Sequence, residues 1–164
     1  MRFTTVLLCS LALIVPAHAD WEIVADEDAD GRYFIATQLD PSGTTELQFI
    51  CDAVSEGRIS IMLYTGDSFS GKKSYPSDFE FELNADGRIV QTLIANYERY
   101  EDEVLLTSHQ YDGPIVEGNL LALRKSKTSI TASFDGKVLE YPSVGLASAI
   151  AAMEEGCPQL APQP

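Results

Sequence analysis

Histidine, cysteine and positive charge are scarce in this chain. Its 164 residues include 2 histidines, 3 cysteines and 11 lysines or arginines, against 25 aspartates or glutamates. A multi-histidine zinc site and a thiol protease both depend on residues that this composition hardly supplies. The formal net charge of −14 repels nucleic acid and anionic membranes, so the composition excludes both as binding partners.

Long apolar runs are scarce too, and the clearest one stands near the N-terminus. It covers residues 6–15, about half the length that a membrane-spanning helix needs. Arg2 precedes the run and an Ala-His-Ala site follows it, which is the pattern of a secretory signal peptide cleaved before Asp20. We therefore expect residues 1–19 to be removed and the finished protein to be periplasmic or secreted, with no transmembrane segment.

We expect the remaining 145 residues (164 − 19) to form a single domain over residues 20–157, followed by a flexible tail over residues 158–164. No repeat or internal linker divides them. They keep 10 basic and 25 acidic residues, a net charge of −15 (10 − 25), and a single histidine, His109. A solvated acidic face is the usual reason for such a charge, so the charge excludes partners rather than naming one.

Two cysteines, Cys51 and Cys157, remain beyond the signal peptide. In an oxidising compartment a single disulfide between them is the natural inference. The alternative is one buried thiol and one free thiol, and the spacing does not decide between the two. A bridge would close a loop of about a hundred residues, worth at most about 4.7 kcal/mol of unfolding free energy in the chain-entropy model.

Short segments with alternating apolar residues, separated by turns rich in glycine and acid, dominate the rest of the chain. The central one, residues 46–63, reads as a β-hairpin in which Cys51 points inward. Residues 78–84 alternate most regularly, with phenylalanine and leucine on one face and acids on the other. We predict a β-rich α+β fold: an antiparallel β-sandwich or flattened barrel of about eight strands with a C-terminal helix packed on it.

The C-terminal segment has helical spacing instead. Residues 144–155 read as one helix, with Ser143 as its cap and Gly156 in a left-handed position at its end. The apolar stripe of this helix has spacings of four, three and four residues and ends in a cysteine: Leu146, Ile150, Met153 and Cys157. A disulfide from this stripe would clamp the helix onto the central hairpin. Residues 115–124 fit a short helix, which we favour, or a strand.

Alternating acids before a glycine form the most metal-like motif. Asp26, Asp28 and Asp30 precede Gly31, and this spacing can wrap carboxylate oxygens around Ca²⁺. A calcium loop of that type closes with a glutamate at its twelfth position, where this chain has Thr37. A solvated acidic hairpin turn is the simpler interpretation. We expect no calcium binding tighter than about millimolar, and no cofactor.

The segment 66–76 is polar, contains two glycines and is long for a hairpin connection. Binding residues concentrate on such loops. Phe69 and Tyr75 are candidate aromatic anchors, and Lys72 and Lys73 form a basic pair in an acidic surface. The alternative is a plain surface loop in which Phe69 or Tyr75 folds back onto the core.

Three features of the chain occur together. The first is an early tryptophan, Trp21, and the second is a sheet cysteine, Cys51, before a turn that contains Gly57. The third is a terminal helix with the sequence Gly-Leu-Ala-Ser-Ala-Ile at residues 145–150. In these features the chain resembles the invasion-associated locus B family, small envelope proteins of Gram-negative bacteria. The resemblance implies a non-catalytic periplasmic or secreted β-rich domain, with no catalytic residues to carry over.

Three classes of function fit the sequence. They are a module that binds an unknown protein of the cell envelope or host, a calcium-stabilised structural domain, and a hydrolase that uses some of the 25 carboxylates. No complete catalytic motif is present: Ser108 adjoins His109, but neighbours on a strand point to opposite faces. The sequence therefore favours the non-catalytic binding module.

Overall fold

A computed structural model of the chain describes residues 20–28, 31–52, 58–70, 78–108, 115 and 117–157. The signal peptide predicted over residues 1–19 and the tail predicted over residues 158–164 lie outside this part of the chain. Within it the chain forms nine strands and two helices. In chain order they are β1 (Glu22–Asp28), β2 (Gly31–Leu39), β3 (Glu46–Asp52), β4 (Ser60–Ser68), β5 (Phe79–Ala85), β6 (Arg88–Tyr100), β7 (Glu103–Ser108), α1 (Glu117–Arg124), β8 (Ser129–Phe134), β9 (Lys137–Pro142) and α2 (Leu146–Gly156).

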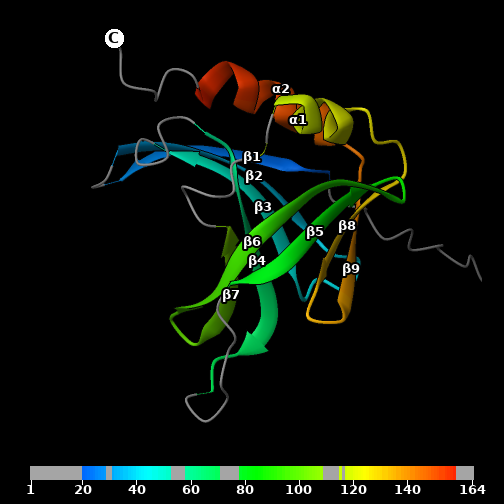
Figure 1. Ribbon diagram of the computed structural model, residues 1–164. Coiled ribbons are helices and arrows are strands. Elements are labelled where there is room, and N and C mark those ends of the chain that lie inside the picture. Colours follow the sequence, from blue (N-terminus) through cyan, green and yellow to red (C-terminus); the bar gives the residue numbers. More distant parts are fainter. Residues whose placement is uncertain are drawn as a thin grey trace, which may run out of the picture.

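All nine strands form one antiparallel sheet, in the order β1-β2-β3-β4-β7-β6-β5-β8-β9. Both helices lie together on one face of it (Figure 1). The fold is a β-rich α+β fold, as predicted, but the predicted sandwich or flattened barrel of about eight strands is wrong, because the nine strands make a single open sheet. The two helices cover the apolar face that a second sheet would otherwise have to cover.

The two edge strands approach each other at one end of the sheet. Trp21, just before β1, donates its backbone N–H to the carbonyl of Val144 at 3.3 Å and its indole N–H to the carbonyl of Pro142 at 2.8 Å. Tyr141 in β9 shares a 2.9 Å hydrogen bond with Thr45. The Trp21 bonds join the start of β1 to the end of β9, and the Tyr141 bond joins β9 to the turn before β3, yet in the described part of the chain β1 and β9 share no strand ladder.

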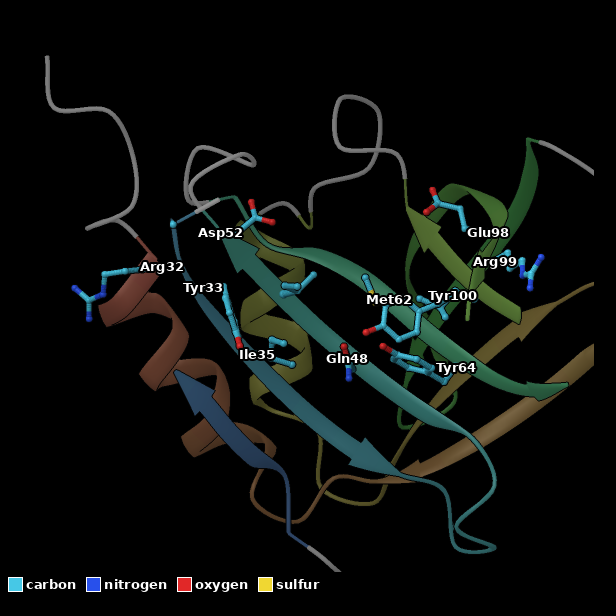
Figure 2. A pocket seen from close by; sticks show the side chains of 13 residues that line it. Arg32, Tyr33, Ile35, Gln48, Asp52, Met62, Tyr64, Glu98, Arg99 and Tyr100 are labelled. Carbon is cyan, nitrogen blue, oxygen red and sulfur yellow. The ribbon is translucent and has the colours of Figure 1, made fainter. Parts of the chain in front are cut away.

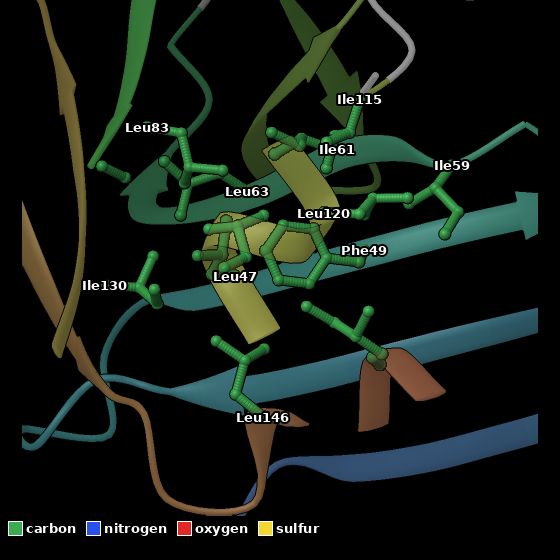
Figure 3. Packing of buried hydrophobic residues seen from close by; sticks show 14 of the residues in the cluster. Leu47, Phe49, Ile59, Ile61, Leu63, Leu83, Ile115, Leu120, Ile130 and Leu146 are labelled. Atoms are coloured by element: carbon green, nitrogen blue, oxygen red, sulfur yellow. The ribbon is translucent and has the colours of Figure 1, made fainter. Parts of the chain in front are cut away.

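The core lies between the sheet and the helices. Alternate side chains of β3 and β4 point toward the helices and are buried, and Figure 3 shows them packed around Phe49 with residues of both helices. The two strands pair antiparallel with Phe49 opposite Ile61, which confirms the predicted central hairpin. Helix α1 begins at Glu117, so the segment 115–124 contains the short helix that we favoured over a strand.

Helix α2 buries the stripe that its spacing predicts: Leu146, Ile150, Met153 and Cys157 are all buried. Cys157 forms a disulfide with Cys51, with Cα atoms 6.0 Å apart, which confirms the predicted bridge between the helix and the central hairpin. The predicted cap is wrong. The residue that precedes the helix is Gly145 and not Ser143. Its φ of 82° favours glycine, and a side chain at position 145 would press on the backbone of Trp21. No helix in the described residues is long and apolar enough to cross a membrane.

Gly156 lies in the last turn of α2 and does not have the left-handed conformation that the sequence suggested. The reason for a glycine here is a close approach between the helix and β2. A Cβ atom at this position would lie 2.6 Å from Cε1 of Phe34, whose ring packs directly on the helix backbone.

Removal of the disulfide tests how far it stabilises this arrangement. In the double variant Cys51→Ala and Cys157→Ala the unfolded chain gains the freedom that a 106-residue separation allows. We expect the unfolding free energy to fall by about 2–5 kcal/mol in urea denaturation, with a far-ultraviolet circular dichroism spectrum still typical of strands. A midpoint equal to that of the native protein would contradict this expectation.

Two glycine-to-alanine substitutions distinguish the effect of the close contact with Phe34 on stability from the effect of helix propensity. Gly156→Ala overlaps the Phe34 ring, so we expect a loss of about 1–3 kcal/mol in the same assay. Gly118→Ala in α1 meets no atom within 4 Å, so it should raise stability by up to about 1 kcal/mol. Equal effects of the two substitutions would show that the contact with Phe34 does not require glycine.

Candidate functional site

The face of the sheet opposite the helices is unusually apolar at its centre. An antiparallel sheet with one covered face normally directs polar residues to the other face. Here β2, β3, β4 and β7 direct four large apolar side chains to the open face: Ile35, Ile50, Met62 and Leu105. Ile35, Ile50 and Met62 are half-buried and Leu105 is buried, so the open face has an apolar centre that its own side chains cover only in part.

These side chains form the floor of a hollow of about 520 Å³, which we call the outer trough. Figure 2 views it with the helices behind the sheet. Tyrosines line the trough at both ends, with Tyr33 at one end and Tyr64 and Tyr100 at the other, and Gln48 lies between them. The remaining lining residues are Gly31, Arg32, Asp52, Glu98 and Arg99.

Strand register brings the trough together from five strands. Ile35 of β2 lies opposite Ile50 of β3, and Gln48 of β3 lies opposite Met62 of β4. Leu105 of β7 then lies opposite Tyr64 of β4. Directly opposed side chains lie on the same face of a sheet, and each of these pairs is two residues further along the strands than the one before, so the trough crosses the strands diagonally.

Two tyrosines enclose the floor at one end of the trough. The rings of Tyr64 and Tyr100 meet edge to face with centroids 6.1 Å apart. Leu105 lies on the outer face beside them, yet it is only 3% exposed. Burial, together with the nearby Tyr100 and Glu46, raises the pKa of the Tyr64 hydroxyl, so this group stays protonated and can donate a hydrogen bond at physiological pH.

The tyrosine hydroxyls of the trough keep their hydrogen-bonding capacity. Within the described residues, the hydroxyls of Tyr33, Tyr64 and Tyr100 make no hydrogen bond. The amide of Gln48 donates to Glu46 at 2.8 Å, and Glu46 also accepts a hydrogen bond from Thr37. The trough therefore combines an apolar floor with tyrosine hydroxyls at both ends that no described residue occupies as a hydrogen-bond partner.

The loop predicted from the sequence begins beside the trough. Strand β4 extends to Ser68, so the first part of segment 66–76 is strand and not loop. Phe69 follows, and its ring lies 5.1 Å from the guanidinium of Arg99, a lining residue of the trough. Lys72, Lys73 and Tyr75 lie outside the described residues, so their part in binding stays a prediction.

The acidic motif lies at the turn of the first hairpin. The backbones of Asp26 and Asp28 pair with Tyr33 and Gly31, and Asp30 lies outside the described residues. In the part of the chain that the structure describes, no three histidine, cysteine, aspartate or glutamate side chains are grouped to hold a metal ion. The weak calcium-binding expectation stays a prediction, because one of the three acids is not described.

Ser108 is buried at the end of β7. Its hydroxyl accepts a hydrogen bond from the backbone N–H of Ile61 at 3.0 Å and so joins β7 to β4. His109 lies outside the described residues. The serine therefore has a structural partner at the edge of the β4–β7 ladder.

Comparison with known proteins gave no match: no family model, no curated protein and no solved structure is similar to this chain. The resemblance to the invasion-associated locus B family therefore stays a prediction, and the candidate site depends on its own geometry.

Truncation of Leu105 tests whether the tyrosines bury the floor of the trough. Leu105→Ala should cost about 2–5 kcal/mol of unfolding free energy, which is typical of a core position and unusual for an open sheet face. The matched control is Ile94→Ala on the outer face of β6, where the side chain is 38% exposed and the cost should be about 1 kcal/mol or less. Similar losses for both variants in urea denaturation would contradict the enclosed floor.

Proposed function

We propose that this protein is an exported, non-catalytic envelope protein that binds another protein through the outer trough. The observation that carries the proposal is the trough itself, an apolar floor with tyrosines at both ends on a face that should be polar. Tyrosine is enriched at protein interfaces and among the residues that contribute most to binding, because it offers a large apolar ring and a hydroxyl at little cost in side-chain entropy.

Export is supported by two independent features. The Ala-His-Ala site after an apolar run is typical of a signal peptide. The disulfide between Cys51 and Cys157 is consistent with an oxidising extracytoplasmic compartment. A partner in the cell envelope or on a host surface fits both features.

The shape of the site favours a protein segment over an enclosed small molecule. The trough crosses five strands and stays open to solvent on the sheet face, with Tyr100 56% exposed. Its volume of about 520 Å³ lies within the range of small-molecule pockets, but such pockets usually bury most of their ligand. An extended segment of a partner lies naturally across a surface of this kind.

Site-specific photocrosslinking in the source cell tests the proposal. A benzoylphenylalanine in place of Tyr100 should crosslink to one discrete protein upon irradiation. The same probe in place of Val138 should not, because Val138 is 68% exposed on β9, outside the trough. Crosslinks of equal yield from both positions, or none from Tyr100, would contradict the proposal.

A second variant tests whether the adjacent loop also contacts the partner. Phe69, Lys72, Lys73 and Tyr75 are all replaced by alanine in the chain that carries the probe at position 100. Loss of the crosslink from a folded variant would show that this loop shares the contact surface, and an unchanged crosslink would restrict the contact to the trough.

A further inference from the structure

The Tyr64–Tyr100 end of the outer trough has the features of a cation site. Tyr100 is 56% exposed, so most of its ring is open to a ligand. The face of an aromatic ring carries partial negative charge and attracts ammonium and guanidinium groups within about 6 Å. The rings of Tyr64 and Tyr100 meet edge to face with centroids 6.1 Å apart, so this end of the trough offers two aromatic rings to one cation.

Carboxylates surround this pair of rings. Glu46 of β3 lies opposite Tyr64, and Glu103 of β7 lies opposite Tyr100. Glu98 of β6 lies opposite Leu105, so all three acids lie on the outer face of the sheet. The pKa of Tyr64 is raised first by burial and by Tyr100, and then by the negative charges of Glu46 and Glu103, in keeping with their position beside the ring.

The two arginines of the trough do not neutralise these acids. Arg99 donates to the carbonyl of Glu101 at 2.5 Å, reaches Asp102 at 3.4 Å and lies over Phe69. Arg32 lies over the ring of Phe34, on the helix side of the sheet, 5.9 Å from its centroid. In the described residues, no lysine or arginine forms an ion pair with Glu46, Glu98 or Glu103.

We infer that the partner's segment presents an arginine side chain to the Tyr64–Tyr100 end of the outer trough, where its guanidinium stacks on tyrosine and pairs with Glu98 and Glu103. This inference rests on the proposed function and names the chemistry of its ligand. Arginine fits better than lysine, because a planar guanidinium stacks on a ring and offers several donors to carboxylates at once. A second copy of this chain does not fit, because two exported molecules, each with 10 basic and 25 acidic residues and a net charge of −15 (10 − 25), repel each other.

A displayed library of random twelve-residue peptides tests the inference. Peptides are selected on the folded native protein in 0.15 M salt and released by excess protein, and the best binder is then synthesised with its arginine and with neutral citrulline in its place. We expect selected peptides to share an arginine, and titration calorimetry to show roughly tenfold weaker binding of the citrulline form.

Two charge-matched variants locate the effect. The double variant Glu98→Gln and Glu103→Gln should remove most of the preference for arginine over citrulline. The double variant Glu22→Gln and Glu140→Gln carries the same net charge, alters acids outside this end of the trough, and should keep the preference. Thermal melting checks that both variants stay folded.

Selected peptides without a basic residue, equal binding of the arginine and citrulline forms, or equal effects of the two double variants would each overturn the inference. Failure to select any peptide would overturn it too. The photocrosslink reports that a protein lies at the trough, whatever the charge of the segment that binds there. A discrete crosslink combined with indifference to arginine would therefore leave the proposed function intact and reject the arginine site alone.

Discussion

Burial of one face of the sheet beneath α2 is the constraint on which the rest of the structure depends. The helix meets the sheet through its apolar stripe, through the close approach of Gly156 to Phe34, and through the disulfide to β3. A single sheet of nine strands cannot cover its own apolar face, so the helices take the place of a second layer. The disulfide links chain segments 106 residues apart and fixes this layer to the centre of the sheet.

That constraint also decides which surface is left for binding. With the inner face covered by α1 and α2, no helix or second sheet in the described part of the chain covers the apolar residues on the other face. Tyr64 and Tyr100 shield Leu105, while Ile35, Ile50 and Met62 remain only partly buried. A domain with one covered face and a tyrosine-lined open face presents a preformed surface, and a preformed surface loses less entropy on binding than a segment that has to become ordered.

Local periodicity explains what the sequence predicted well. The alternation around Phe49 and the stripe from Leu146 to Cys157 each depend on near neighbours in the chain, so the hairpin and the helix followed from them. The bridge followed instead from the expected export and from the two cysteines that remain after it. The open sheet did not, because it depends on which distant strands pair, such as β4 with β7 and β5 with β8. The sequence did not predict the trough for the same reason. A signal was present, because strands that are covered on both faces have consecutive apolar residues, as at Phe49 with Ile50 and at Leu105 with Leu106.

Methyl resonances of methionine offer the most direct test that binding takes place on the outer face. The described chain has one methionine on each side of the sheet, Met62 in the trough and the buried Met153 in α2. Both methyl groups can be followed by nuclear magnetic resonance in selectively labelled protein while the crosslinked partner, or a peptide selected on the protein, is added. We expect the Met62 signal to shift in proportion to the bound fraction and the Met153 signal to stay in place. A shift of Met153 with an unchanged Met62 would place binding on the helix side of the sheet and contradict the account.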